Sequence, residues 1–581
     1  MKHFWKYTLA TITGVVITTI VGTFILMGIL GAISSSSSKP VKVKAPSIYE
    51  LELKGQLVDR SEDDPFSAAF ASAMGQDAVK MIGLDDVLLN IQKAKNDEQV
   101  KGIYLKGGQL MGGMASIKEI RDALVDFKST GKFIVAYADN YIQSNYYMAT
   151  VADKVLLNPQ GMVDFRGIAS ELLFLKNTLD KLGVEMQVVK VGTYKSAVEP
   201  YIETKMSDAN REQVTAYTRS IWNTVLNEIA VSRNITVDQL NTYADEMMTF
   251  QPSEKLVAYN MIDSLVYADE ADSILSTYLK DYKILNHSSM TKVVDNAKFS
   301  KDKVAVIYAV GPIDDGSGSG IVSEKLVKTI NEAAKDKMVK SVVFRVSSPG
   351  GSAYGSEQIW RALMNLKKSK PLIVSMGDYA ASGGYYISAP ADTIVAQPNT
   401  ITGSIGIFGL IPNIDGLNKK LGFSYDVVKT NAMSDAPSLN RAFRPEERAL
   451  MQAYVDRGYE LFVKRCADGR SKTPDEIKAI AEGRVWTGEE ALKLGLVDVL
   501  AGLDEAIEIA AGKAGLTEYN VKEFPAKEDF QTRLLKSLSE EVETRLLKMR
   551  LGEQYQLLQH LRTIRHMNGI QARLPYELKM Y

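Results

Sequence analysis

The sequence holds little of what several common protein classes require. Its 581 residues include a single cysteine, Cys466, so no disulfide can form within the chain. This absence is compatible with an oxidising and with a reducing compartment, so it does not indicate where the protein works. The charge is balanced, with 69 basic and 70 acidic residues, so no global field favours a polyanion. We therefore expect neither a disulfide-stapled scaffold nor a nucleic-acid partner.

Histidine, the usual base for a nucleophilic serine or cysteine, is scarce as well. The chain has only four, in the N-terminal flank, a central polar connection and the C-terminal tail: His3, His287, His560 and His566. None lies in a segment with the pattern of a domain core. A Ser-His-Asp triad is therefore not expected, and any serine nucleophile needs another base.

Charge is missing altogether from one long stretch, Thr8–Ile33. It exceeds the ~20 apolar residues that span a bilayer as a helix. A secretory signal also starts with basic residues, but its apolar core is usually only ~7–15 residues long; a buried core helix is the other alternative. We expect residues 1–46 to form an N-terminal flank, a transmembrane anchor and a linker. Basic residues flank the run on both sides, so charge does not fix its orientation.

The rest of the chain repeats itself at a constant offset of 239 residues. Lys101–Leu124 lies over Lys340–Leu363, and the match continues without a gap to Val188–Lys190 over Val427–Lys429. Chance rarely gives so many identities at one offset, so the chain contains two copies of one domain.

Within each copy, short apolar runs alternate with amphipathic helices. In the second copy, Val304–Val310, Ser341–Val346 and Pro371–Met376 are predicted strands, and Ser356–Lys367 is a predicted helix. This order is typical of an α/β domain with a largely parallel sheet covered on both faces.

Composition sets the predicted boundaries. We place the first copy at residues 47–285 and the second at 302–525, separated by a polar connection. Residues 526–581 are predicted to be a helical extension, which either docks on a partner or is solvated.

Two glycine-rich turns in the second copy suggest chemistry. Ser347–Ser352, SSPGGS, follows one predicted strand, and Ala381–Tyr386, ASGGYY, follows the next. Glycines at strand ends let backbone N–H groups converge on one point, as an oxyanion hole requires, although tight turns use glycine pairs for steric reasons too. Ser382 would lie beside such a donor.

Comparing the copies separates the candidates. Ser382 aligns with Gln143, and Lys195 aligns with Ser434, so each copy keeps one half of a possible pair. Random drift after the duplication is the alternative explanation for these two differences. Lys190 has a counterpart in the second copy and is interpreted as structural or solvated. A lysine whose pKa is lowered by burial can replace histidine as the base, so we predict Ser382 as nucleophile and Lys195 as general base.

The strings VGTYKSAVEP, SSPGGS, ASGGYYIS and TGSIGIFG resemble those of the S49 peptidase family in its long, duplicated, signal-peptide-degrading form, over nearly the whole chain. The resemblance implies a tandem Clp protease/crotonase-like fold without metal or cofactor. It implies Lys195 as base and Ser382 as nucleophile. It also implies that Ser404 orients Lys195, and that the N–H groups of Gly351 and Gly383 form the oxyanion hole.

The same resemblance implies a serine endopeptidase with a single membrane pass in a bacterial inner membrane and catalytic domains on the periplasmic side. Its partners would be cleaved signal peptides and other hydrophobic peptides, the lipid bilayer, and three further copies in a homotetramer. Two other interpretations are a crotonase-like acyl-CoA enzyme and a non-catalytic membrane scaffold. The sequence leaves open whether Lys195 and Ser382 of one site come from the same chain.

Overall fold

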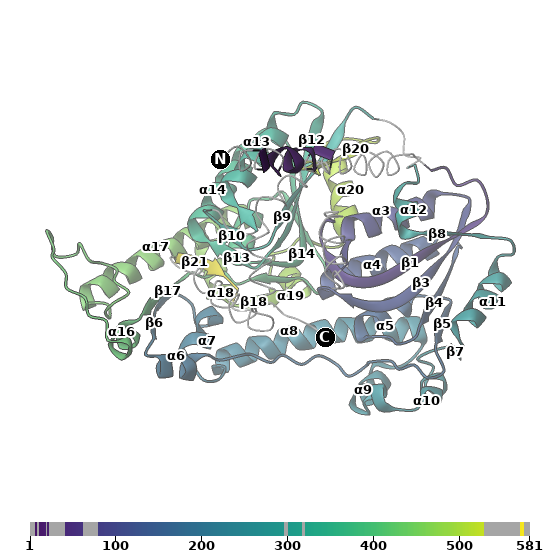
Figure 1. The fold of residues 1–581 in the computed structure, drawn as a ribbon, viewed down its shortest axis with the longest axis horizontal. Helices are drawn as coiled ribbons and strands as arrows, with labels where there is room; N and C mark the ends of the chain where they lie inside the picture. The colour runs from purple at the N-terminus through teal and green to yellow at the C-terminus, as the bar shows by residue number, and fades with distance from the viewer. Residues whose placement is uncertain are drawn as a thin grey trace.

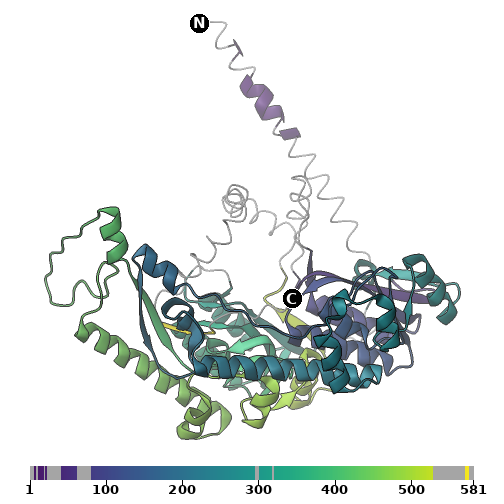
Figure 2. The ribbon, with the colours of Figure 1, turned by 90° about the horizontal axis from the view of Figure 1, so that it is seen from below.

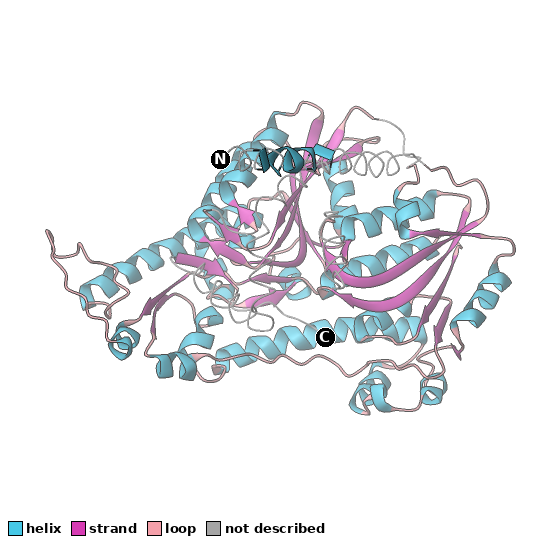
Figure 3. Cartoon of the chain, viewed as in Figure 1, coloured by secondary structure: helices cyan, strands magenta, loops and turns pink. Residues whose placement is uncertain are grey.

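The computed structural model describes residues 6–7, 11–18, 20–21, 41–61, 80–294, 300–316, 320–527 and 570–574. Within these ranges the strands form three sheets, of seven, eight and six strands. Figure 1 shows the two larger sheets side by side, with the long helix α8 (Asp208–Arg233) running along both of them. Figure 3 shows helices on both sides of the strands, which confirms the predicted α/β class.

The seven-stranded sheet comes from the first copy and has the order β2-β1-β3-β4-β5-β7, with β8 also paired to β1. All its pairs are parallel. Its strands are β1 (Ser47–Val58), β2 (Met81–Gly83), β3 (Val100–Met111), β4 (Phe133–Ala138), β5 (Lys154–Leu157), β7 (Ser264–Leu265) and β8 (Lys283–Asn286). The strand β8 falls at the edge of the expected polar connection, so the first sheet continues past residue 285.

The eight-stranded sheet comes from the second copy and has the order β18-β16-β14-β12-β9-β20, with β15 joining β14 to β19. Its pairs are parallel except β16 with β18. Its strands are β9 (Lys303–Val310), β12 (Val339–Ser348), β14 (Leu372–Ala381), β15 (Thr393–Ala396), β16 (Ile401–Gly403), β18 (Val485–Thr487), β19 (Val499–Leu500) and β20 (Asn520–Phe524).

The six-stranded sheet contains segments from both copies and from the tail. Its order is β11-β10-β13-β21-β17-β6. The strands are β6 (Glu185–Lys190), β10 (Ile313–Asp314), β11 (Ile321–Val322), β13 (Gly350–Ser352), β17 (Phe408–Asn413) and β21 (Ile570–Arg573). Because β6 belongs to the first copy and β17 to the second, this sheet links the two.

Helices cover both faces of the large sheets, which explains the uninterrupted apolar strands. In β9, Val304 and Val306 pack towards α20, while Ala305 and Ile307 pack in the cluster that contains α13 and α14. The helices of the first copy are α3 (Leu84–Asn96), α4 (Met114–Lys128), α5 (Gln143–Ala149), α6 (Lys176–Leu182), α7 (Glu199–Ile202), α8, α9 (Val237–Asp245), α10 (Ser253–Ala258), α11 (Ala268–Tyr278) and α12 (His287–Thr291). Those of the second are α13 (Ser323–Lys335), α14 (Ala353–Lys367), α15 (Gly383–Ser388), α16 (Asp415–Leu421), α17 (Pro445–Arg470), α18 (Pro474–Ile480), α19 (Gly488–Lys493) and α20 (Leu503–Lys513).

The duplication predicted from the sequence is confirmed by matching elements. Helices α4 and α14 have the same length and lie at the predicted offset, as do α6 and α16. The long helices α8 and α17 also correspond in length, with 26 residues each, although they start 237 residues apart (445 − 208) and not 239.

A buried ion cluster joins the copies. Arg345 on β12 donates from Nε to Asp59 at 3.0 Å and from Nη2 to Glu119 on α4 at 2.7 Å. Asp378 on β14 accepts bonds from the N–H and hydroxyl of Ser116 on α4 at 2.9 and 2.8 Å. Removing one partner would leave a buried charge unpaired, so the cluster opposes separation of the copies.

Both ends of the chain lie largely outside the described residues, including most of the predicted span Thr8–Ile33. The part of that span at residues 11–18 is helical with exposed side chains, and Figure 2 shows it projecting away from the sheets. In the described ranges, no helix has the length and hydropathy to cross a bilayer. In the tail, Ile570–Arg573 form the strand β21, where we expected helix.

Candidate active site

Three polar side chains from the two copies meet beside the third sheet. The Nζ atom of Lys195 lies 2.7 Å from the Oγ atom of Ser382 and 3.1 Å from the Oγ atom of Ser404. It also donates to the carbonyl oxygen of Ser404 at 3.1 Å. All three residues have no exposed surface. The structure therefore brings together the residues predicted as base, nucleophile and orienting hydroxyl, and it does so within one chain.

Lys195 reaches this position because β6 pairs with β17 of the second copy. Beyond β6, the N–H of Val191 donates to Ile407 at 3.1 Å and that of Tyr194 to Glu482 at 2.9 Å. Gly483 packs directly against Lys195: a Cβ at this glycine would lie 2.7 Å from the Cβ of Lys195, and its φ is +78°. Only glycine permits this approach, so Gly483 is part of what positions the lysine.

Ser382 lies at a sharp turn between a strand and a helix. We expected its strand to end before Gly377, but β14 continues to Ala381, the residue before the serine. The φ and ψ of Ser382 are 55° and −112°, a strained conformation for a residue with a side chain. Its N–H donates to Gly403 at 2.8 Å, and its carbonyl accepts from Tyr386 at 2.8 Å. These bonds keep Ser382 in its strained backbone conformation and orient its hydroxyl towards Lys195.

Burial lowers the pKa of the Lys195 amine well below its usual value. The amine loses its hydration, and in the described part of the chain no carboxylate pairs with it to favour the charged form. A neutral amine carries a lone pair that can accept a proton from a hydroxyl at 2.7 Å. The geometry thus permits proton transfer from Ser382 to Lys195.

Gly351 on β13 and Gly383, the first residue of α15, lie next to each other beside this pair. A Cβ at Gly383 would lie 3.1 Å from the backbone nitrogen of Gly351 and 2.8 Å from the hydroxyl of Ser356. Two backbone N–H groups close to a nucleophilic oxygen can stabilise an oxyanion. The predicted donors are therefore near enough to act on one carbonyl group.

The corresponding place in the first copy holds different groups. Gln143 replaces the serine, and its side-chain oxygen accepts the N–H groups of Arg166 and Gly167 at 3.1 and 3.0 Å. Phe165, which is fully buried, occupies the position that corresponds to Ser404. Ser434, the counterpart of Lys195, is exposed on a loop. Lys190 lies on β6, where it pairs with Phe408 of β17.

Gln213 on α8 supports the lysine segment, and the sequence analysis missed it. Its amide nitrogen donates to the carbonyl of Tyr194 at 3.1 Å and the hydroxyl of Ser196 at 3.0 Å, on either side of Lys195. Its amide oxygen accepts the N–H of Val485 at 3.1 Å. A glutamine in a long amphipathic helix carries no sequence signal for such a role.

A metal centre is not visible among the residues that the structure describes: no three His, Cys, Asp or Glu side chains gather closely enough to hold an ion. His287, the first residue of α12, lies against Tyr49 on β1 of the first sheet, and its Nδ1 atom is 2.8 Å from the tyrosine hydroxyl.

Comparison with known proteins agrees with this picture. The model of peptidase family S49 matches the chain twice, at residues 126–281 and 364–517. Protease 4 of Salmonella typhi is 36% identical over 81% of this chain and 79% of its own, and Protease 4 of Haemophilus influenzae is 33% identical over 88% and 86%. The chloroplastic serine protease SPPA of Arabidopsis thaliana is 30% identical over 82% and 70%. The match to a solved structure, a ClpP1 mutant from Listeria monocytogenes, covers 35% of this chain and 94% of the other at 13% identity, with a TM-score of 0.24.

Proposed function

Because the chain belongs to peptidase family S49 and is a serine protease, we propose that Ser382 and Lys195 form its catalytic dyad. One observation carries the proposal: a fully buried lysine lies 2.7 Å from a serine held in a strained turn. Burial of a charged lysine that has no carboxylate partner in the described chain costs free energy, so this position favours the neutral amine. A neutral lysine is the form that a general base requires.

In the first half of the reaction, the Oγ atom of Ser382 attacks the carbonyl carbon of the peptide. Its proton moves to the Nζ atom of Lys195, which becomes an ammonium. The N–H groups of Gly351 and Gly383 stabilise the charge on the carbonyl oxygen. The ammonium then gives its proton to the leaving nitrogen, the peptide bond breaks, and an acyl-enzyme remains.

In the second half, the same residues act on water. Lys195 accepts a proton from the water molecule as that molecule attacks the acyl carbon, and it returns the proton to Oγ as the ester bond breaks. Ser404 keeps the amine in place throughout, because its hydroxyl and carbonyl both lie 3.1 Å from Nζ and neither adds a charge that would raise the pKa of the lysine.

The proposed substrates are cleaved signal peptides and other hydrophobic peptides, in line with the resemblance of the motifs. The apolar run Thr8–Ile33 would tether the enzyme to the inner membrane, with the two copies on the periplasmic side. A tethered protease meets peptides retained in the same membrane at a high effective concentration.

The duplication also supports the proposed homotetramer. Inside the chain, β6 of the first copy pairs antiparallel with β17 of the second. The counterparts of these strands, residues 424–429 and 169–174, form no strand in the described chain. They expose apolar side chains, including Leu173 at 67% and Val428 at 97%. We expect residues 424–429 of one copy to pair with residues 169–174 of the next, which is a head-to-tail contact that can close into a ring.

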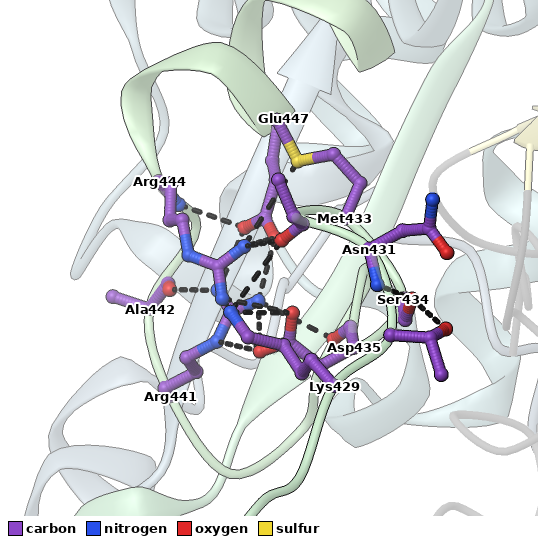
Figure 4. A network of polar contacts seen from close by, with 11 residues as sticks. Lys429, Asn431, Met433, Ser434, Asp435, Arg441, Ala442, Arg444 and Glu447 are labelled. Carbon is purple, nitrogen blue, oxygen red and sulfur yellow. Dashed lines mark hydrogen bonds and ion pairs between the residues drawn. The ribbon is translucent and has the colours of Figure 1, made fainter.

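The loop that follows residues 424–429 is held in shape by charge (Figure 4). Asp435 accepts bonds from Arg444 at 2.6 Å and from Arg441 at 3.0 Å, and these bonds hold its pKa well below its usual range. Arg441 also bonds Glu447 and, with its neighbours, lowers the pKa of that carboxyl to about 2. A fixed loop can present the segment to a partner with little loss of entropy.

Sedimentation tests the assembly. Val428→Asp should convert the tetramer into smaller species, whereas Val231→Asp, at a site 85% exposed on α8, should not. Equal sedimentation of both variants and the unmodified protein would exclude this contact.

For the chemistry, the full chain is incubated with a fluorogenic hydrophobic peptide and with a serine-reactive probe. Turnover together with labelling at Ser382 supports the dyad. Labelling at another serine, or turnover that survives Ser382→Ala, would show that the nucleophile lies elsewhere.

A further inference from the structure

The side chain of Arg484, the residue before β18, lies between two aromatic rings. Its guanidinium carbon is 4.7 Å from the centre of the Tyr194 ring and 4.4 Å from the centre of the Trp486 ring. One of its nitrogens also donates to the Tyr194 hydroxyl at 3.0 Å. An arginine that is stacked between two rings and hydrogen-bonded to one of them has little freedom to move.

Each ring leads to a different member of the dyad. Tyr194 directly precedes Lys195 in the chain, so the position of its ring limits that of the lysine segment. Trp486 packs on Gly403, where an added Cβ would lie 2.8 Å from a ring carbon of the tryptophan. The carbonyl of Gly403 accepts the N–H of Ser382 at 2.8 Å, one of the bonds that keep the serine in its strained conformation. The arginine between the rings therefore links the support of the base to that of the nucleophile.

The backbone of Arg484 holds the third member of the cluster. Its carbonyl accepts the N–H of Ser404 at 2.6 Å, and the hydroxyl and carbonyl of Ser404 both lie 3.1 Å from the Nζ atom of Lys195. In the second copy, the counterpart of Tyr194 is Met433 (433 − 194 = 239). The stacked tyrosine thus belongs to the copy that keeps the lysine.

We propose that Arg484 is a positioning residue for the reaction: stacked between the two rings, it keeps the amine of Lys195 within reach of the Ser382 hydroxyl. This inference rests on the proposed dyad. The side chain of Arg484 bonds Tyr194 and Glu212 and touches no reacting atom, so its effect on catalysis passes through the rings.

The planar shape of the arginine matters here more than its charge. Arg484 forms an ion pair with Glu212 at 2.8 Å, but the side chain of that glutamate is 54% exposed, and exposed pairs contribute little. A lysine at this position would keep the positive charge and lose the planar group that fits between two rings. Arg484→Lys should therefore impair catalysis about as much as Arg484→Met.

Steady-state kinetics of the full chain with the fluorogenic peptide, measured across pH, test the proposal. Arg484→Met and Arg484→Lys should each lower kcat about 10- to 100-fold with little change in KM, because a small displacement of the reacting groups is costly. The midpoint of the pH profile should move to higher pH, since a displaced amine is better hydrated and its pKa returns towards the usual value. Tyr194→Phe keeps the ring and loses only the hydroxyl, so it should act in the same direction and more weakly.

Arg457→Met serves as the matched control, since Arg457 also stacks on a tyrosine, Tyr454, at 5.7 Å on the exposed side of α17. It should leave kcat, KM and the midpoint unchanged. A lower Tm with unchanged kcat and midpoint in the Arg484 variants would overturn the proposal, as would normal activity of Arg484→Lys or an equal loss in Arg457→Met. If the arginine variants do not fold, Tyr194→Phe decides, and an unchanged kcat and midpoint there would overturn the proposal as well. Peptide turnover that survives Ser382→Ala would instead show that the proposed dyad itself fails.

Discussion

The Nζ atom of Lys195 lies 2.7 Å from the Oγ atom of Ser382, although 187 residues separate them in the chain. The duplication makes this contact possible, because β6 of the first copy carries the lysine into the second copy. The first copy has the lysine but not the serine, and the second copy has the serine but not the lysine. A fully buried amine without a carboxylate partner in the described chain is unfavourable for folding, so activity should respond when either residue is replaced, and stability should respond when the lysine is replaced.

Ser382→Ala and Lys195→Ala should each reduce kcat by several orders of magnitude, with about a millionfold loss for the serine. The double variant should be scarcely worse than either, because two groups that act as one unit lose their benefit together. Steady-state kinetics with the fluorogenic peptide measure this. Lys190→Ala, on the same segment, is the control and should have little effect; a comparable loss there would instead indicate a folding role for the segment.

Replacing the lysine should not weaken the fold. The pKa of Lys195 is lowered in the folded state, so the unfolded chain binds its proton more tightly between that lowered value and ~10.4. The group therefore destabilises the fold at neutral pH, and this destabilisation fades as the pH rises towards ~10. Lys195→Met should have an equal or higher Tm at neutral pH. A clearly lower Tm would mark the lysine as a charged structural residue.

Gln213→Leu should act through Lys195 without touching the substrate. Loss of the bonds to Tyr194, Ser196 and Val485 should lower kcat about 10- to 100-fold with little change in KM, and leave buried groups unpaired at a cost of about 1–3 kcal/mol. The pH profile should shift because the lysine moves. Thr215→Leu, exposed on the same helix, is the control. A loss of stability with an unchanged pH profile would reduce Gln213 to a structural residue.

The ion cluster between the copies should make stability depend on pH. Desolvation raises the pKa of Glu119 to about 7, despite the opposing effect of Arg345. The folded chain therefore binds this proton more tightly than the unfolded chain, in which glutamate has a pKa of ~4.3. As a result, the contribution of Glu119 to the free energy of unfolding falls as the pH rises from about 5 to 7. Urea unfolding should show this slope, and Glu119→Gln should flatten it. An unchanged slope in the variant would assign the dependence to other groups.

Much of this architecture could be predicted from the sequence because it follows local patterns. Apolar runs between amphipathic helices indicated the parallel sheets, and the repeat offset separated Ser382 and Lys195 from shared residues such as Lys190. Gln213 could not be found in this way, since its role depends on a contact between helix α8 and the loop around Lys195. The strand at Ala572 was missed for a similar reason: its pairing partners lie some 160 to 220 residues earlier in the chain, and four residues have no periodicity of their own.

The most direct test of the dyad is the rate at which a serine-reactive probe labels Ser382, measured against pH in the unmodified protein and in Lys195→Met. In the unmodified protein the rate should rise with pH and level off at a midpoint well below the usual lysine value, because a buried, neutral Lys195 accepts the serine proton. In Lys195→Met the rise should vanish and the rate should fall about 10²- to 10⁴-fold. The same midpoint and a similar rate in the variant would contradict the account, because they would show that another group activates Ser382.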